Sequence, residues 1–179
     1  MAVHIALLRA VNVGGRSLKM ASLIALANDL GFENPRTLLQ SGNLVFESRE
    51  RGDAKLEQRL EAEAEKRFGF PVDFMLRTAT EWRGLVAANP YPEAARDDPA
   101  HLLAMPLKTA PAAGALDALR AAIKGPEQVE IDGRDAYLVY PAGIGRSKLT
   151  ITVIERHLGV RGTARNWNTV LKLAEMAMV

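Results

Sequence analysis

The sequence predicts an α+β fold built from two related βαββαβ units in tandem. Short apolar runs alternate with segments of helical periodicity along the whole chain, and a proline-rich interruption divides it near the middle. The same order of landmarks then appears in each half, which favours a duplication. A chain of 179 residues is long enough to bury the cores of two small units without disulfides.

The first half predicts the order strand, helix, strand, strand, helix, strand. Residues 3–10 are short and apolar, so we expect a mostly buried strand. Leucine and alanine recur at helical spacing from Met20 to Leu30, and Gly31 follows as a C-terminal cap. The remaining elements are expected as a hairpin of strands at 37–40 and 44–47, a helix capped by Asp53 and ended by Gly69, a strand at 72–76 and a short helix from Thr80.

Residues 91–99 are expected to be a linker without regular structure, because prolines remove backbone donors and disfavour helix in the residues before them. This placement gives a first unit at 1–90 and a second unit at 100–179. The second unit is expected to contain strands at 101–105, 127–131, 135–140 and around Thr163, and helices at 112–123, 147–158 and 168–177. Residues 150–154 are β-branched and also suit a strand, but the repeat favours a helix there.

Six landmarks support the repeat, and each second member lies 85 to 97 residues after the first. The pairs are His4 and His101, Gly31 and Gly125, Gly42 and Gly133, Phe46 and Tyr137, Gly69 and Gly159, and Trp82 and Trp167. A βαββαβ unit is the ferredoxin-like motif, one antiparallel sheet in the order 4-1-3-2 with its helices on one face. In that topology the loop after the first strand and the hairpin between the second and third strands share one end of the sheet.

Composition excludes several classes of function. The absence of cysteine excludes a thiolate metal site and a cysteine nucleophile, and it fits a reducing compartment, so we expect a cytoplasmic protein. No apolar run approaches the roughly 20 residues of a membrane helix. The three histidines lack ligand spacing, and neither the Walker nor the dinucleotide-binding glycine pattern is present, so no metal and no cofactor are expected.

A first candidate site lies at the shared end of the first unit. The paired glycines after the first strand form a loop whose backbone N–H groups can approach a phosphate or a carboxylate. The alternative is that these glycines and the hairpin residues only make turns. The candidate ligand-binding residues are Arg9, Asn12, Gly14, Gly15, Ser41 and Asn43.

A second candidate site combines two segments of the second unit that the topology places at one end of its sheet. Two glycines lead into a serine that is expected to cap a helix between two cations, and a later segment carries one arginine and two carboxamides. We expect one anion-binding pocket formed by Arg146, Ser147, Lys148, Arg165, Asn166 and Asn168. The alternative is a capped helix with solvated charges, with Arg165 bonded to neighbouring backbone.

Four strings in this chain resemble the signatures of a bacterial family, domain of unknown function 1697. They are HIALLRAVNVGG, LGFENPRTLLQSGNLVFES, PAGIGRSKL and GTARNWNTVLKLAEMA, which span the chain from the first strand to the last helix. One departure is Ala10, where the family carries glycine. The resemblance implies a duplicated α+β fold and brings no established activity, so it assigns no catalytic residue.

Three classes of function remain. The preferred hypothesis is a protein that binds a small phosphate- or carboxylate-bearing ligand, such as a nucleotide. A nucleic-acid-binding protein is less favoured, because the chain has 6% aromatic residues and its first strands carry no stacking rings. The third alternative is a protein-interaction module without a small ligand. A net charge of +2 decides between none of them, and the sequence leaves open both enzymatic activity and oligomeric state.

Overall fold

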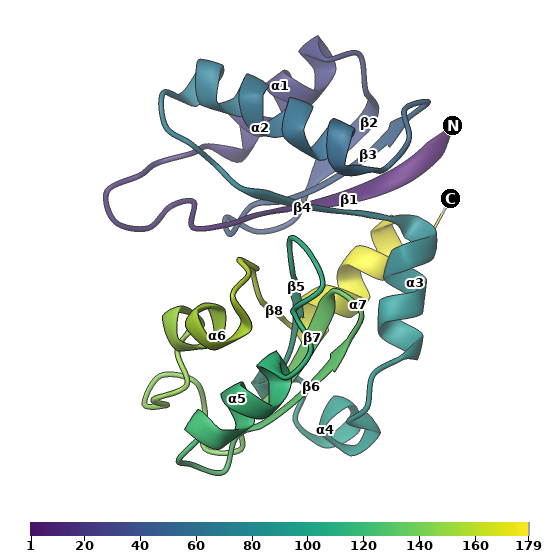
Figure 1. Cartoon of the computed structure of the whole chain (residues 1–179). Coiled ribbons are helices and arrows are strands. Elements are labelled where there is room, and N and C mark those ends of the chain that lie inside the picture. The colour runs from purple at the N-terminus through teal and green to yellow at the C-terminus, as the bar shows by residue number, and fades with distance from the viewer. Residues whose placement is uncertain (179) are drawn as a thin grey trace. The chain divides into compact units, whose positions relative to one another are not determined.

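The computed structural model describes residues 1–178 and contains two compact units, each built on a four-stranded antiparallel sheet (Figure 1). The first unit comprises Met1–Gly84 together with the end of the chain from Lys172, and the second comprises Leu85–Leu171. The boundary therefore falls inside helix α3 (Ala79–Ala87), earlier than the linker expected at 91–99. The α+β class and the two antiparallel sheets are confirmed.

The strand order matches the predicted topology in both units. The first sheet has the order β2-β3-β1-β4, and the second has the order β6-β7-β5-β8. The strands of the first sheet are β1 (Ala2–Leu8), β2 (Glu33–Thr37), β3 (Asn43–Ser48) and β4 (Phe74–Thr78). The strands of the second sheet are β5 (Leu102–Pro106), β6 (Gln128–Asp132), β7 (Asp135–Val139) and β8 (Arg165–Asn166). The first strand of each unit is central, as the ferredoxin-like motif requires.

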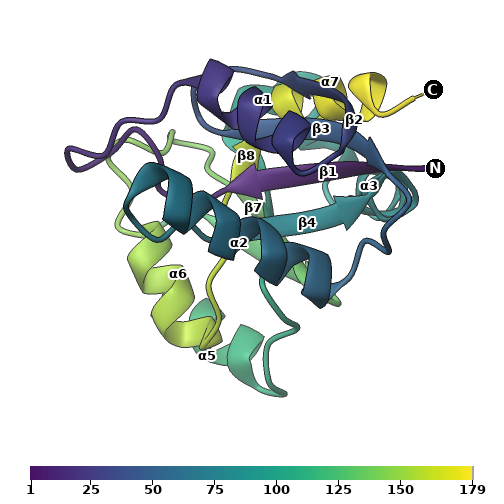
Figure 2. The ribbon, with the colours of Figure 1, turned by 90° about the horizontal axis from the view of Figure 1, so that it is seen from above.

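Helices α1 (Met20–Asp29) and α2 (Ala54–Phe68) cover one face of the first sheet (Figure 2). Their leucines pack against alternate residues of the strands, such as Leu44 and Phe46, to form one core. The Asp53 side chain accepts hydrogen bonds from the first-turn amides of α2, and Gly69 ends the helix at φ 80°. These two caps are where the sequence predicts them.

The second sheet carries α5 (Ala115–Ala122) and α6 (Ile151–Leu158) on one face. Helix α6 begins later than expected, because its cap is Thr150, whose hydroxyl accepts from the Val153 amide at 3.3 Å. The expectation that Ser147 caps this helix is wrong. The β-branched segment is nevertheless helical, since Ile154 and Leu158 bury one face against the sheet. Helix α7 (Trp167–Met176) ends the chain.

Two further sequence expectations need correction. The linker contains the short helix α4 (Pro92–Asp97) and a 3₁₀ turn at Pro99–His101, because proline is well tolerated in the first turn of a helix. The first strand of the first hairpin, expected at 37–40, is β2 at Glu33–Thr37, and the connection to β3 therefore runs from Leu38 to Gly42. Asn43 holds this longer loop by donating from its amide to the Leu38 carbonyl at 2.6 Å.

The outer edge of β4 is covered by carboxylates. Its outward N–H groups, those of Phe74, Leu76 and Thr78, donate to Glu61, Glu57 and Glu81 at 2.9, 2.8 and 2.7 Å. These acceptors use the hydrogen-bonding capacity that an edge strand otherwise offers to another chain. No helix within residues 1–178 has the length and apolar character needed to cross a membrane.

Candidate functional site

The two loops of the first candidate site contact each other. The Leu8 amide donates to the Gly42 carbonyl at 2.9 Å, and the Asn12 side-chain amide donates to the Gln40 carbonyl at 2.6 Å. The β1–α1 loop and the β2–β3 loop therefore lie together at one end of the first sheet, as the topology predicts.

The polar side chains at this end are occupied in holding the loops. The Asn12 side-chain oxygen accepts from the Leu18 amide at 2.8 Å, and the buried Asn43 amide donates to the Ser41 hydroxyl at 3.0 Å. Arg9 lies 3.9 Å from Asp73 in an ion pair. Gly14 and Gly15 are exposed and have φ values of 58° and 82°. These contacts favour a role in turn formation, and a ligand here stays a prediction.

The backbone at this end is strained. Ala10, Asn12 and Leu39 have φ values of 57°, 57° and 61°, in the left-handed region that costs a residue with a side chain about 1–2 kcal/mol. At Gly42, a Cβ atom would come within 2.8 Å of Leu8 Cβ and of Val11 Cγ2. Only glycine fits that position, because the two loops approach each other so closely.

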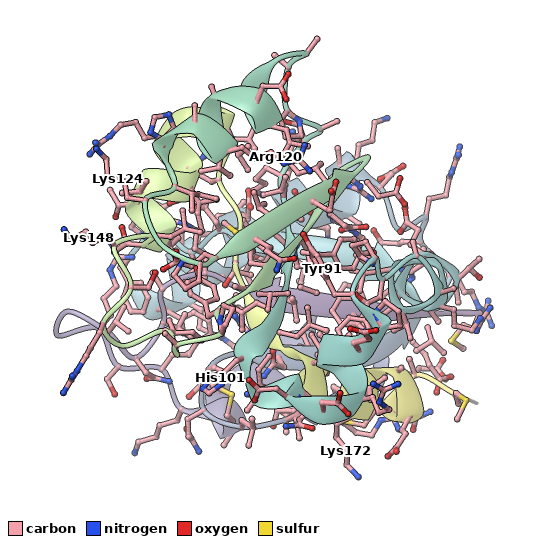
Figure 3. The ribbon with its side chains drawn as sticks, turned by 90° about the horizontal axis from the view of Figure 1, so that it is seen from below. Tyr91, His101, Arg120, Lys124, Lys148 and Lys172 are labelled. Atoms are coloured by element: carbon pink, nitrogen blue, oxygen red, sulfur yellow. The ribbon has the colours of Figure 1, made fainter. Side chains whose placement is uncertain are left out.

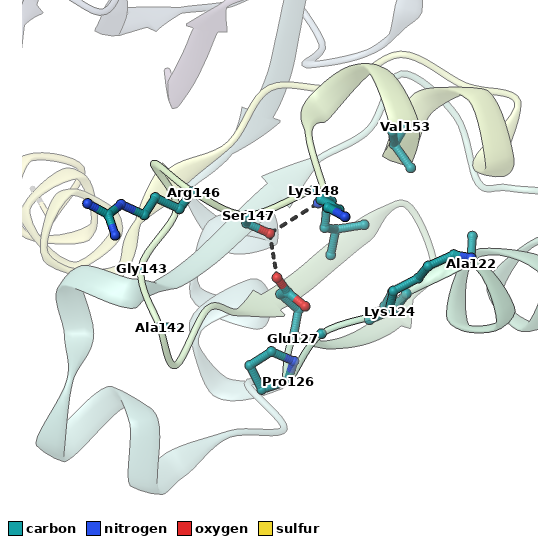
Figure 4. A pocket seen from close by; sticks show the side chains of 13 residues that line it. Ala122, Lys124, Pro126, Glu127, Ala142, Gly143, Arg146, Ser147, Lys148 and Val153 are labelled. Carbon is teal, nitrogen blue, oxygen red and sulfur yellow. Dashed lines mark hydrogen bonds between the residues drawn. The ribbon is translucent and has the colours of Figure 1, made fainter.

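The second unit contains a pocket of about 300 Å³ between the loop after β7 and the segment after α5 (Figure 4). At its centre, the Ser147 hydroxyl donates to the Glu127 carboxylate and accepts from the Leu149 amide at 3.1 Å. The Ser147 hydrogen bond holds the pKa of Glu127 below its usual range, so this carboxylate is ionised at neutral pH.

Three cations line the same pocket. They are Lys124, Arg146 and Lys148, all exposed to solvent. Figure 4 shows the Arg146 side chain extending away from the Ser147–Glu127 pair, whereas Lys148 lies beside it. Even without Arg146, two lysines against one carboxylate leave the pocket with a positive balance, which suits an anionic group.

The second predicted segment does not line this pocket. Arg165 has only 9% of its surface exposed, and its guanidinium donates to the Thr163 hydroxyl at 2.8 Å and to the Ala164 carbonyl at 2.9 Å. Burial lowers the pKa of Arg165 to about 10. Asn166 accepts from the Thr169 amide at 3.0 Å and so caps α7, while Asn168 is exposed. The structure thus brings Arg146, Ser147 and Lys148 together without the Arg165 segment.

A matching arginine in the first unit clarifies Arg165. Arg77 lies on β4, the fourth strand of its unit, has 1% of its surface exposed and donates to the preceding carbonyl, that of Leu76, at 2.9 Å. Arg165 likewise lies on the fourth strand of its own unit and bonds the carbonyl that precedes it. The shared arrangement supports the duplication. It also favours a structural role for Arg165, because both arginines are buried and bond their own backbone.

Sequence reasoning missed Lys124 and Glu127, which line the pocket. Both flank Gly125-Pro126, a turn signal directly after a helix, and this was the only indication available. Within residues 1–178 there is no group of three or more histidine or carboxylate side chains that could hold a metal ion.

Comparison with known proteins identifies one family and a solved structure of similar fold. Residues 1–137 match the family model described as protein of unknown function, DUF1697. The conserved bacterial protein SP0830 from Streptococcus pneumoniae has a similar solved structure, with a TM-score of 0.78, 20% identity and 98% of each chain covered. That likeness establishes the fold alone. No curated protein matches the chain.

Proposed function

Because this chain belongs to the DUF1697 family, whose description carries no activity, we propose a function from the pocket of the second unit. This pocket binds a small molecule that carries a phosphate or carboxylate group. The observation behind the proposal is the grouping of Lys124, Arg146 and Lys148 around a hollow of about 300 Å³, a volume at the lower end of small-ligand sites.

The carboxylate in the pocket narrows the class of ligand. An ionised Glu127 only accepts hydrogen bonds, so a ligand beside it must offer a hydroxyl or amino donor. The lysines supply charge-assisted donors for an anionic group. A sugar phosphate or a nucleoside monophosphate carries hydroxyl donors as well as an anionic group. Inorganic phosphate at neutral pH offers mainly the anionic group.

Calorimetric titration with adenosine monophosphate and with inorganic phosphate tests the proposal. Replacing both Lys124 and Lys148 by alanine removes two charge-assisted contacts, each worth about 1.5–3 kcal/mol, and should weaken nucleotide binding at least about tenfold. Glu127→Gln should weaken the nucleotide more than phosphate, because only the nucleotide uses the carboxylate as an acceptor. The matched control is Lys55→Ala, an exposed lysine on α2 that does not line the pocket.

Two results would contradict the proposal. One is equal affinity in the double variant and in Lys55→Ala. The other is tight binding of an oligonucleotide that persists at physiological salt. Non-specific contacts to duplex DNA lose about 0.9 log units of affinity per log unit of salt for each phosphate contacted, so persistent binding would indicate a true nucleic-acid-binding surface. We expect weak oligonucleotide binding that disappears at physiological salt.

A further inference from the structure

A second hollow, of about 370 Å³, adjoins the pocket of the second unit. Ile123 and Glu127 line both cavities, so the two meet at these residues. The other residues that line the second hollow are Tyr91, Arg120, Gln128, Val129 and Glu130. A ligand held in the pocket therefore has room to continue past Glu127 into the second hollow.

The charges of the second hollow disfavour another anionic group. Arg120 is the cation among its lining residues, and this guanidinium forms an ion pair with Glu130 at 2.5 Å. It also donates twice to the Val129 carbonyl, at 3.1 and 3.3 Å. Because Glu127 adds a second carboxylate, the hollow suits a neutral group that carries hydrogen-bond donors.

Tyr91 and Arg120 offer the two kinds of surface on which a nucleobase stacks, an aromatic ring and a planar guanidinium. The bonds to Val129 and Glu130 fix the Arg120 guanidinium, while its Nη1 has no hydrogen-bond partner among residues 1–178. The Tyr91 hydroxyl likewise has no partner in that part of the chain. Burial and the Glu130 charge raise the pKa of Tyr91 to about 12, so this hydroxyl is a donor at neutral pH.

We propose that the ligand of this site is a nucleoside monophosphate whose base lies against Tyr91 and Arg120. The inference rests on the proposed function and extends it from the phosphate to the base. The order of groups in a nucleotide matches the order of residues along the two cavities. The phosphate lies at Lys124 and Lys148, the ribose hydroxyls lie at Glu127, and the base fills the second hollow. Figure 3 labels Tyr91, Arg120, Lys124 and Lys148 in one view of the second unit.

A sugar phosphate is the competing occupant. It would fill the pocket and leave the stacking surfaces and the uncommitted donors of Tyr91 and Arg120 unused. The pocket alone is at the lower limit of the roughly 300–1,000 Å³ that small-molecule sites span, whereas the two cavities together fall well inside that range. Size and chemistry therefore both favour the nucleotide.

Calorimetric titration of the full-length protein with ribose 5-phosphate and with the four ribonucleoside 5′-monophosphates tests the inference. Base stacking should make at least one nucleotide bind at least about tenfold tighter than ribose 5-phosphate. Tyr91→Leu removes the ring and should remove this preference while leaving the affinity for ribose 5-phosphate unchanged. The matched control is Tyr91→Phe, which keeps the ring and should keep most of the preference. If Tyr91→Leu does not fold, NMR contacts between base protons and the Tyr91 ring of the natural protein decide the question.

The outcomes separate this inference from the proposed function. Equal affinity for all five ligands, lost on replacing both Lys124 and Lys148 by alanine, would overturn the nucleotide and leave the anion pocket standing. An equal loss of nucleotide and ribose 5-phosphate binding in Tyr91→Leu would overturn the placement of the base. No binding of any of the five ligands, or binding that the double lysine variant leaves unchanged, would overturn both.

Discussion

Ala10 is a residue whose backbone conformation conflicts with its side chain. Its φ of 57° lies in the left-handed region, which favours glycine. The position is separated from the end of β1 at Leu8 only by Arg9, so the turn into the β1–α1 loop requires this conformation. The departure noted in the sequence therefore coincides with a point of strain in the structure.

Ala10→Gly should stabilise the protein by about 0.5–1 kcal/mol, because relief of about 1–2 kcal/mol of strain exceeds the added flexibility of the unfolded chain, about 0.5–1 kcal/mol. Chemical denaturation measures the free energy of unfolding. The matched control is Ala113→Gly, at an exposed turn residue without a positive φ, which should bring no gain. A destabilised Ala10→Gly protein would contradict the argument.

His4 is a second residue with an unusual environment. It is fully buried on β1, stacks on Phe46 at 5.2 Å, and neither ring nitrogen makes a hydrogen bond to any of residues 1–178. Desolvation lowers the pKa of His4 below 6.5, while the nearby Glu50 and Glu81 charges and the backbone of Glu50 and Ser48 act in the opposite direction.

A lowered pKa in the folded state makes the unfolded chain bind the proton more readily. The stabilising contribution of neutral His4 is therefore full above about pH 6.5 and is lost as the pH falls toward the folded-state pKa. Denaturation between pH 7 and pH 5.5 should show the free energy of unfolding falling by up to about 1.4 kcal/mol per pH unit. His4→Phe should remove most of this pH dependence of the free energy of unfolding, whereas His157→Gln should retain it. If the His4→Phe protein shows the same slope, the pH dependence arises from another group.

At the scale of elements, helix α2 acts on the sheet through charged residues as well as apolar ones. Its leucines fill the core, and Glu57 and Glu61 reach the edge strand β4. Glu57 has only 8% of its surface exposed, because its carboxylate accepts from the buried Leu76 amide.

Glu57→Ala should lower the free energy of unfolding by about 1–3 kcal/mol, because it leaves the buried Leu76 amide without this acceptor. Glu57→Gln keeps an acceptor oxygen and should cost less. The control is Glu65→Ala, an exposed glutamate on the same helix, with an expected change within about 0.5 kcal/mol. Equal losses in Glu57→Ala and Glu65→Ala would show that the edge contact contributes nothing.

At the scale of the whole molecule, the two units share a topology and differ in their loops. Both sheets have the same strand order, and both carry a buried arginine on the fourth strand. The strained, tightly bonded loops belong to the first unit, and the cationic pocket belongs to the second. Duplication thus preserved the framework while the connecting segments diverged, as loops generally do.

The sequence by itself determined the α+β class, the order of the elements and the position of the central strands. These depend on local periodicity and on the glycine, proline and capping signals at the ends of elements, which act within a few residues. Only the tertiary structure decided the burial and the hydrogen-bond partners of individual polar side chains. Ser147 bonds Glu127 instead of capping a helix, and Arg165 is buried instead of lining a pocket, because such contacts depend on which distant segments pack together.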